Sequence, residues 1–331
     1  TSRLMDKPVI LVVGGAGYIG SHMVLDLLRA GYSVVTLDNL SRGHRDLVPG
    51  GDFVHGDLAN PGDLENVFRQ YPVTAVMHFA AWSLVGESVE QPLLYYRNNV
   101  AATLNLLEAM QQADVRHFIF SSTAAVYGEP EKSPITEDHA CAPANPYGAS
   151  KLAVERILHD VSQATGMNFC CLRYFNAAGA DASGRIGERH IPETHLIPLI
   201  LQVATGQRES ITIYGTDYPT ADGTCVRDYI HVSDLARAHL LALESLLNGG
   251  ANKIYNLGNS NGYSVAQVIE TARGITGHPL PAIPAGRRAG DPATLIADST
   301  RIRTDLGWAP GYEDLESIIR TAWNWHRQEA Q

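Results

Sequence analysis

Residues 9–20 read VILVVGGAGYIG, and this stretch decides the fold. The run Val9–Val13 is wholly apolar and β-branched at four of its five positions, which is typical of a strand buried on both faces of a parallel sheet. The amphipathic stretch Tyr18–Ala30 predicts a helix that ends at Gly31. A second apolar run, Val34–Leu37, completes a strand–helix–strand unit.

The same alternation continues along the first half of the chain. We expect strands at 75–79, 117–120 and 169–172, and helices at 64–71, 92–112 and 147–165. This pattern predicts an α/β fold with a Rossmann-like doubly wound parallel sheet. The alternation is interrupted after Asn176, so we expect the Rossmann domain at 1–176. A smaller C-terminal α/β substrate-binding region at 177–331 would return some segments to the sheet.

Composition excludes several classes of protein. Of the 331 residues 45% are apolar and 18% charged, which indicates a globular chain rather than a disordered one. The net charge of −10 argues against nucleic-acid binding, and no apolar run reaches the roughly 18 residues that span a membrane. The four cysteines, Cys141, Cys170, Cys171 and Cys225, form no CxxC pair, so we expect core thiols, no metal and a cytoplasmic protein. We expect Met5 to be the natural first residue.

The glycine-rich turn predicts a dinucleotide site. Gly14, Gly17 and Gly20 join the first strand to the first helix, where a bare backbone lets a pyrophosphate approach the helix N-terminus. Asp38 follows Gly20 by 18 residues, at the end of the second strand, where a carboxylate accepts hydrogen bonds from the adenosine ribose. Because that carboxylate would repel a 2′-phosphate, we expect NAD rather than NADP.

Two further strand ends point to the same site. Asp57 and Leu58 follow a short strand and could reach the adenine, and the fourth strand ends in His78-Phe79-Ala80-Ala81. Small residues are needed where a cofactor crosses the edge of the sheet.

A catalytic group is predicted on the helix that starts near residue 147. Tyr147 and Lys151 are four residues apart and so share one helix face. The lysine ammonium and the positive nicotinamide of NAD would both favour the phenolate and lower the pKa of Tyr147. Thr123 ends the preceding strand, where its hydroxyl could hydrogen-bond a substrate alcohol.

Other segments carry a resemblance that covers nearly the whole chain after Lys7. They are VGESV at 85–89, YYRNNV at 95–100, FIFSST at 118–123, LRYFN at 172–176, YGTDYPTADGT at 214–224 and VRDYIHV at 226–232. Together with the glycine turn, they make the chain similar to the extended short-chain dehydrogenases/reductases, and within them to the UDP-glucose 4-epimerases (UDP-galactose 4-epimerases).

The resemblance implies a reversible inversion of UDP-glucose and UDP-galactose at carbon 4, through a transient 4-keto sugar and tightly bound NAD. It implies NAD contacts from Tyr18, Ile19, Asp38, Asn39, Asp57, Leu58, Phe79, Ala80, Ala81, Asn98, Tyr147, Lys151 and Phe175. It implies substrate contacts from Thr123, Asn176, His195, Leu196, Thr212, Tyr214, Arg227, Arg288, Asp291 and Leu295. Arg227 and Arg288 are the candidates for the diphosphate, since a guanidinium pairs with two phosphate oxygens.

Some alternatives stay open. His195 stands where many family members carry Asn, and it can still donate a hydrogen bond to the nucleotide. Leu295 stands where they carry Tyr or a smaller residue, and its intermediate size leaves UDP-N-acetylhexosamines open as substrates. An epimerase for UDP-uronic acids and a catalytically silent NAD-sensing regulator are further candidates. Ala124 and Ala125, which follow Thr123, disfavour a 4,6-dehydratase because that reaction needs an acid pair there.

The expected helix at 92–112 is apolar on one side, through Leu93, Leu94, Val100, Leu104 and Leu107. By the resemblance, it would pack against a second copy of the chain, so we expect a homodimer. The alternative is that this side only covers the sheet.

Overall fold

The computed structural model describes residues 7–331, so the expectation about Met5 lies outside the described residues. Residues 7–128, Cys141–Arg173 and His239–Ile254 form a first unit. Glu129–Ala140, Tyr174–Ala238 and Tyr255–Gln331 form a second unit. The chain therefore passes between the units several times, whereas the sequence suggested one main boundary at residue 176.

Most of the first unit is built on a seven-stranded sheet of order β10-β6-β5-β4-β1-β2-β3, in which the last residue of β6 and the last three of β10 are assigned to the second unit. Its strands are β1 (Val9–Val13), β2 (Ser33–Asp38), β3 (Asp52–His55), β4 (Val73–His78), β5 (His117–Thr123), β6 (Asn168–Tyr174) and β10 (Lys253–Leu257). β1 pairs in parallel with both β2 and β4, and β2–β3 and β4–β5 are also parallel. The predicted doubly wound sheet is confirmed, and its strand order reverses direction at β1.

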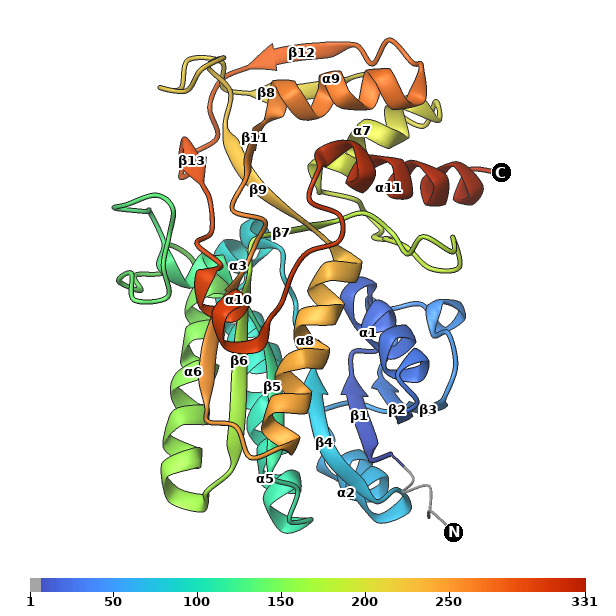
Figure 1. Cartoon of the computed structure of the whole chain (residues 1–331), viewed down its shortest axis with the longest axis vertical. Coiled ribbons are helices and arrows are strands. Elements are labelled where there is room, and N and C mark those ends of the chain that lie inside the picture. Colours follow the sequence, from blue (N-terminus) through green and yellow to red (C-terminus); the bar gives the residue numbers. More distant parts are fainter. Residues whose placement is uncertain (1–6) are drawn as a thin grey trace. The chain divides into compact units, whose positions relative to one another are not determined.

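The helices of this unit cover both faces of the sheet (Figure 1). They are α1 (Tyr18–Arg29), α2 (Pro61–Gln70), α3 (Val85–Glu90), α4 (Pro92–Tyr96), α5 (Ala102–Gln112), α6 (Pro146–Thr165) and, from His239 onward, α8 (Val232–Leu247). Short helical segments lie at Arg45–Leu47 (η1), Arg97–Ala101 (η2) and Ala124–Tyr127 (η3). Leu64 of α2, Leu106 of α5 and Val154 of α6 join one buried cluster with strand residues such as Val76 and Phe118.

The helix expected at 92–112 is present, but its backbone is not α-helical throughout. η2 is a π-helical segment that separates α4 from α5. Its extra backbone residue re-aims the side chains that follow it, and such segments are frequent at functional sites.

The second unit contains two small sheets and four helices among its described residues. Its strands are β7 (Asn176–Ala178), β8 (Ile211–Tyr214), β9 (Val226–His231), β11 (Gly262–Ser264), β12 (Ala282–Ala285) and β13 (Thr294–Leu295). One sheet has the order β11-β9-β13, with β7 also paired to β9, and the other joins β8 to β12. The helices are α7 (Leu196–Ala204), α9 (Val265–Thr276), α10 (Thr300–Leu306) and α11 (Leu315–Glu329), and the unit also holds α8 up to Ala238.

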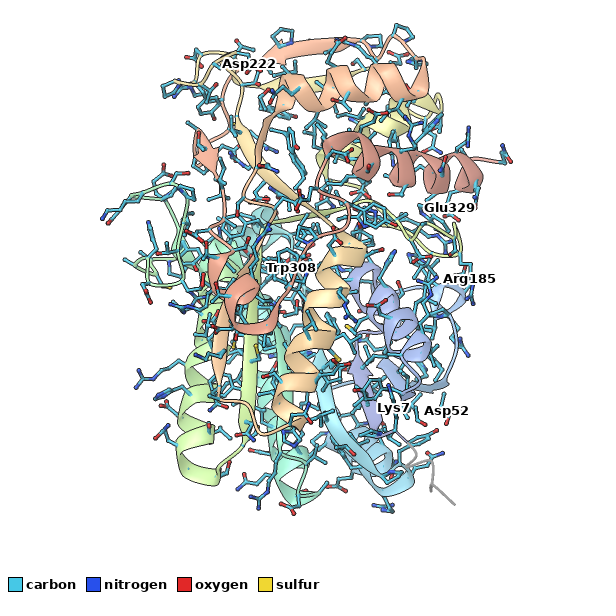
Figure 2. The ribbon with its side chains drawn as sticks, in the orientation of Figure 1. Lys7, Asp52, Arg185, Asp222, Trp308 and Glu329 are labelled. Atoms are coloured by element: carbon cyan, nitrogen blue, oxygen red, sulfur yellow. The ribbon has the colours of Figure 1, made fainter. Side chains whose placement is uncertain are left out.

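The core of this unit lies between α7, α9 and α11. Leu201, Ile269 and Ile319, one from each helix, are at most 1% exposed and belong to one cluster. Trp308, labelled in Figure 2, is buried and donates a hydrogen bond from Nε1 to the carbonyl oxygen of Asp234 at 2.9 Å.

Cys170, Cys171 and Cys225 are buried free thiols, as expected, but Cys141 is exposed because it lies in a loop before α6. Within residues 7–331, none of the helices combines the length and the apolar character that crossing a membrane requires.

Candidate active site

The turn between β1 and α1 depends on its glycines. Gly14 has φ +83°, and a Cβ atom there would lie 2.6 Å from the backbone nitrogen of Ala80. A Cβ atom at Gly20 would lie 2.1 Å from the carbonyl oxygen of Gly14. The backbone of this glycine turn therefore packs directly against the backbone of the first helical turn of α1 and of the end of β4. No side chain would fit between them.

The N-terminus of α1 is suited to an anion. Its N-cap residue, Gly17, provides no side-chain hydrogen bond to the first turn. The first N–H groups of a helix lack intrahelical acceptors, and the helix dipole adds positive potential at the same place. A phosphate group that reached this backbone would be stabilised by both effects.

Asp38 lies beside this turn at the end of β2. Its Oδ2 accepts a hydrogen bond from the backbone nitrogen of Ala16 at 3.0 Å, and its Oδ1 accepts one from Leu40 at 2.8 Å. These two bonds fix the carboxylate, and each oxygen keeps a further lone pair for a hydroxyl donor. The position therefore fits recognition of a ribose.

The loops after β2 and β3 meet next to Asp38. Asn39 donates from Nδ2 to Oδ2 of Asp57 at 3.2 Å, and Leu58 is buried behind them. A hollow at this place is lined by Asn39, Ser41, His55, Gly56, Asp57 and Asp63. Its polar walls lie where the sequence places the adenosine end of the cofactor.

The end of β4 adjoins the glycine turn. Phe79 donates from its backbone nitrogen to the carbonyl oxygen of Val13 at 2.7 Å, and Ala80 and Ala81 follow it, half-buried. His78 hydrogen-bonds through Nε2 with Oγ1 of Thr103 at 3.0 Å. Burial, aided by the charge of Lys151, lowers the pKa of His78 to about 3, so this imidazole is neutral at pH 7.

Asn98 lies in η2, and its Nδ2 donates to Oδ1 of Asn99 at 2.9 Å. Asn99 in turn bonds both backbone groups of Trp82 at 3.0 Å and Oγ of Ser150 at 3.1 Å. Asn99 thus connects the loop after β4 to α6. The sequence analysis named Asn98 but not Asn99, although the two asparagines are consecutive in the sequence.

Tyr147 and Thr123 are brought together as predicted. Asn145 and Pro146 start α6, and the Asn145 side chain accepts from Gly148, which fixes the helix start around Tyr147. The Tyr147 hydroxyl is hydrogen-bonded to the Thr123 side chain at the end of β5. Oγ1 of Thr123 accepts from Ala125 N at 3.1 Å, so its own proton is available to the phenolic oxygen.

Lys151 lies one turn further along α6 and is 4% exposed. Its Nζ donates to the carbonyl oxygen of Ser121 at 2.7 Å and lies 4.9 Å from the centre of the Phe120 ring. Burial lowers the pKa of Lys151 to about 7, although the charge of Glu155 acts in the opposite direction.

One part of the predicted electrostatics is wrong. Burial raises the pKa of Tyr147, and the hydrogen bond from Thr123 only opposes that rise. The expected lowering by Lys151 is not found; its amino group instead donates to the carbonyl oxygen of Ser121, and burial lowers its own pKa. The residues of the chain alone therefore leave the phenol a weaker acid than free tyrosine.

Glu155 is a positioning residue that sequence analysis missed. It follows Lys151 by four residues and is buried, and it forms a two-bond ion pair with Arg173 at 2.6 and 3.1 Å. Arg173 also donates to the hydroxyl of Tyr127 at 3.0 Å. The spacing 147, 151, 155 on one helix was the available signal, and this network fixes the face of α6 that carries Tyr147 and Lys151.

Three predicted substrate residues share one sheet of the second unit. Asn176 in β7 and Arg227 in β9 lie on neighbouring strands, and Leu295 of β13 is the register partner of Arg227. The buried Nδ2 of Asn176 has no hydrogen-bond acceptor among the described residues. Arg227 donates to the carbonyl oxygen of Val226 at 2.9 Å.

A second group forms around β8, which contains Thr212 and Tyr214. The Arg288 guanidinium lies 4.8 Å from the centre of the Tyr214 ring and pairs with Asp291 at 2.9 Å. Arg288 is 61% exposed at its side chain, so it is accessible to an anionic ligand.

The remaining predicted residues of this unit are Phe175, next to Asn176, and the pair His195 and Leu196 at the start of α7. Phe175 donates from its backbone nitrogen to Leu257 at 3.1 Å. His195 is the N-cap of α7, Leu196 is its first residue, and Nδ1 of His195 lies 2.8 Å from Oε1 of Glu193.

Comparisons with known proteins agree with this geometry. The family model described as the NAD dependent epimerase/dehydratase family matches residues 10–258. The chain belongs to this family.

Individual members of the family are similar over almost their whole length. A UDP-glucose 4-epimerase of Halalkalibacterium halodurans is 55% identical, over 96% of this chain and 96% of the relative. The crystal structure of a UDP-glucose 4-epimerase from Brucella ovis in complex with NAD is 48% identical, with a TM-score of 0.94 over 96% and 97% of the two chains. The Bifidobacterium longum enzyme in complex with NAD+ and UDP is 38% identical, with a TM-score of 0.92 over 97% and 98%.

The first unit fits the dinucleotide that the family name specifies. A Cβ atom at Gly14 or Gly20 would fill the backbone cradle, and the start of α1 favours a phosphate. The carboxylate of Asp38 is fixed at the end of β2, where it could accept from a ribose hydroxyl. These three features are independent of one another, and all lie at the carboxyl edge of β1 and β2.

Proposed function

We propose that this chain catalyses the reversible inversion of UDP-glucose and UDP-galactose at carbon 4, with tightly bound NAD. The observation that carries this proposal is the contact between Tyr147 and Thr123 at the carboxyl end of β5. That end lies on the same edge of one sheet as the glycine turn after β1. To invert an alcohol carbon by oxidation and reduction, an enzyme needs a base for the hydroxyl proton and a bound dinucleotide for the hydride. Both are expected on this edge of the sheet.

In the proposed mechanism the phenolate oxygen of Tyr147 takes the proton of the 4-hydroxyl and later returns it. Thr123 donates to the phenolic oxygen and steadies it during both transfers. Lys151, whose Nζ donates to the carbonyl oxygen of Ser121, would place an amino group on this face of α6. When bound, NAD supplies the acceptor and donor of the hydride at carbon 4, so the overall reaction consumes no oxidant.

NAD would be held by residues of the first unit, with its pyrophosphate at the start of α1 and its adenosine ribose at Asp38. Asn39, Asp57 and Leu58 would face the adenosine end. Asn98 and the residues after β4 would face the remaining part of the NAD molecule.

We propose that the second unit binds the uridine diphosphate. The diphosphate carries about two negative charges and the protein carries −10, so local cations must attract it against the overall field. Arg227 and Arg288 provide guanidinium groups, and Asn176 provides a buried amide donor that needs an acceptor. Since the sugar must present both faces at carbon 4, we expect strong contacts to the nucleotide and few fixed ones to the hexose.

The decisive experiment adds UDP-galactose to the purified chain without NAD and measures UDP-glucose. We expect conversion, and we expect Tyr147→Phe to lower kcat by about 10²–10⁴-fold. Tyr71→Phe, which removes a hydroxyl beside Asp52 at the end of α2, serves as the matched control. Undiminished turnover by Tyr147→Phe would refute the proposal.

The same assay separates the alternatives. Turnover of UDP-glucuronate but not of UDP-galactose would identify a uronic-acid epimerase. NAD binding without turnover of any UDP-sugar would identify a regulator.

We also propose that the chain forms a homodimer through α3 to α5. Val89, Leu93 and Leu104 are exposed by 61%, 76% and 40%. Of the residues that we expected on this side, Leu107 and Val100 instead pack into the core of the first unit. Sedimentation of Leu93→Glu against the unchanged chain tests the proposal, and an unchanged monomeric mass for both would contradict it.

A further inference from the structure

The loop before α7 gathers two histidines and two glutamates. Glu188, His190, Glu193 and His195 each direct one nitrogen or oxygen atom to a common point, and these atoms all lie within 4.8 Å of one another. Nδ1 of His190 lies 3.4 Å from Oε2 of Glu193 and 3.7 Å from Oε2 of Glu188. Nδ1 of His195 lies 2.8 Å from Oε1 of Glu193 and 3.9 Å from Oε2 of Glu188.

Glu188 is the member whose burial is hardest to explain. Its side chain is only 5% exposed, and its Oε2 accepts no hydrogen bond from any described residue. A buried carboxylate is normally neutralised by a hydrogen-bonded partner or by a metal ion. The nearest nitrogens, at 3.7 and 3.9 Å, are beyond hydrogen-bond distance, so Oε2 faces the centre of the cluster without the donor that its burial requires.

The backbone that carries the cluster is fixed on α11. Trp325 donates from Nε1 to the carbonyl oxygen of Glu188 at 3.1 Å, and a Cβ atom at Gly187 would lie 2.2 Å from the Trp325 ring. Arg189 forms two bonds with Glu329, labelled in Figure 2 near the end of α11, at 2.7 and 2.8 Å. The one arginine inside the segment is therefore paired with an acid outside the cluster.

We propose that Glu188, His190, Glu193 and His195 bind one divalent transition-metal ion of the Zn²⁺ class. Tetrahedral ligands at about 2.0–2.1 Å from Zn²⁺ are separated from one another by about 3.3 Å. The four histidine–glutamate separations, from 2.8 to 3.9 Å, bracket that value, and all the ligand atoms lie within 4.8 Å of one another, so modest side-chain movements would bring them onto one ion.

The chemistry of the donors selects the ion. Two imidazoles and two carboxylates favour Zn²⁺, Co²⁺ or Ni²⁺, whereas Mg²⁺ and Ca²⁺ prefer oxygen ligands alone. Two ionised carboxylates and two neutral imidazoles carry a charge of −2, which a divalent cation neutralises. Sequence analysis searched for cysteine pairs and so overlooked the pattern E-x-H-x-x-E-x-H at 188–195.

The bound ion would have a structural role in the second unit. His195 is the N-cap of α7, so a ligand bond through its Nδ1 would fix the start of that helix and the position of Leu196. Nε2 of the same ring would still carry a proton for a hydrogen bond to another group. This inference does not depend on the proposed reaction.

Metal binding by the full, tag-free chain tests the proposal. After dialysis against a chelator, the chain is titrated with Zn²⁺ by calorimetry, and its visible absorption is recorded with Co²⁺. Glu188→Gln and His190→Gln are compared with His159→Gln, which alters an exposed histidine 3.4 Å from a single acid, Asp160. Circular dichroism establishes that each variant is folded.

We expect one ion per chain for the unchanged protein and for His159→Gln, and at least tenfold weaker binding for the other two variants. The thermal midpoint should rise with Zn²⁺ in the unchanged chain but not in Glu188→Gln. Absence of stoichiometric binding, or equal binding by Glu188→Gln and the unchanged chain, would overturn the proposal. Because no substrate is used, failure here leaves the test of epimerase activity unaffected.

Discussion

Two ion pairs of equal length allow the energetic role of burial in this protein to be measured. Nη2 of Arg173 lies 2.6 Å from Oε1 of Glu155, with side chains 5% and 4% exposed. Nη2 of Arg320 also lies 2.6 Å from Oε1 of Glu316, but these side chains are 56% and 63% exposed. We predict that Glu155→Gln destabilises the chain far more than Glu316→Gln.

The expected magnitudes follow from the two environments. Loss of one partner from a buried ion pair costs about 3–5 kcal/mol, because the remaining charge stays buried without compensation. Loss of an exposed pair on one helix costs about 0–1 kcal/mol. With an unfolding entropy of about 2.1 cal/mol/K per residue, the midpoint should fall by about 4–7 °C for Glu155→Gln and by less than about 2 °C for Glu316→Gln.

The assay is thermal unfolding of the two variants and the unchanged chain, followed by circular dichroism at one pH. Glutamine keeps the size of the side chain but exchanges one acceptor oxygen for an N–H donor. Because both variants carry the same exchange, the difference between them reports the effect of burial. Equal losses in the two variants, or a loss below 1 kcal/mol for Glu155→Gln, would show that the network around Arg173 does not stabilise α6 as we infer.

Three other predictions concern ligands. Gly20→Ala should lower the NAD content of the purified chain at least tenfold, because the new Cβ atom would meet the carbonyl oxygen of Gly14. Gly274→Ala should leave the NAD content unchanged, since a Cβ atom at this helical glycine would have no atom within 4 Å, and equal NAD contents in the two variants would contradict the backbone cradle. Asn176→Asp should raise KM for UDP-galactose by about 10–100-fold without loss of NAD, and an unchanged KM would remove Asn176 from the diphosphate site. The unchanged chain should convert UDP-N-acetylglucosamine and Leu295→Tyr should not; no turnover by the unchanged chain at high concentration would exclude the permissive role of Leu295.

The features that local sequence determines were predictable. The strand Val9–Val13 occurs as expected, and the glycine turn and Asp38 lie together because a strand–helix–strand unit brings their ends to one edge. Tyr147 and Thr123 also meet, since the end of β5 and the start of α6 lie at that edge.

The remainder depends on contacts between distant parts of the chain. The segment Glu129–Ala140 belongs to the second unit through bonds such as Ile135 N to Ile296 O, 161 positions apart by number, and no local pattern encodes such a pairing. The burial of Asn176 and Glu188 likewise results from neighbouring strands and from α11. Their polar atoms become informative only once the fold shows that solvent is excluded from them.

The electrostatics of Tyr147 indicate how the base would be controlled. Burial raises the pKa of its hydroxyl, and the hydrogen bond from Thr123 opposes this rise. Lys151 loses much of its own tendency to stay charged, with a pKa of about 7. If the proposed reaction is correct, a further positive charge must therefore favour the phenolate, and the oxidised nicotinamide is the one that the family supplies. Proton removal would then be coupled to occupation of the dinucleotide site, because a chain without an oxidised cofactor would hold its tyrosine in the neutral form.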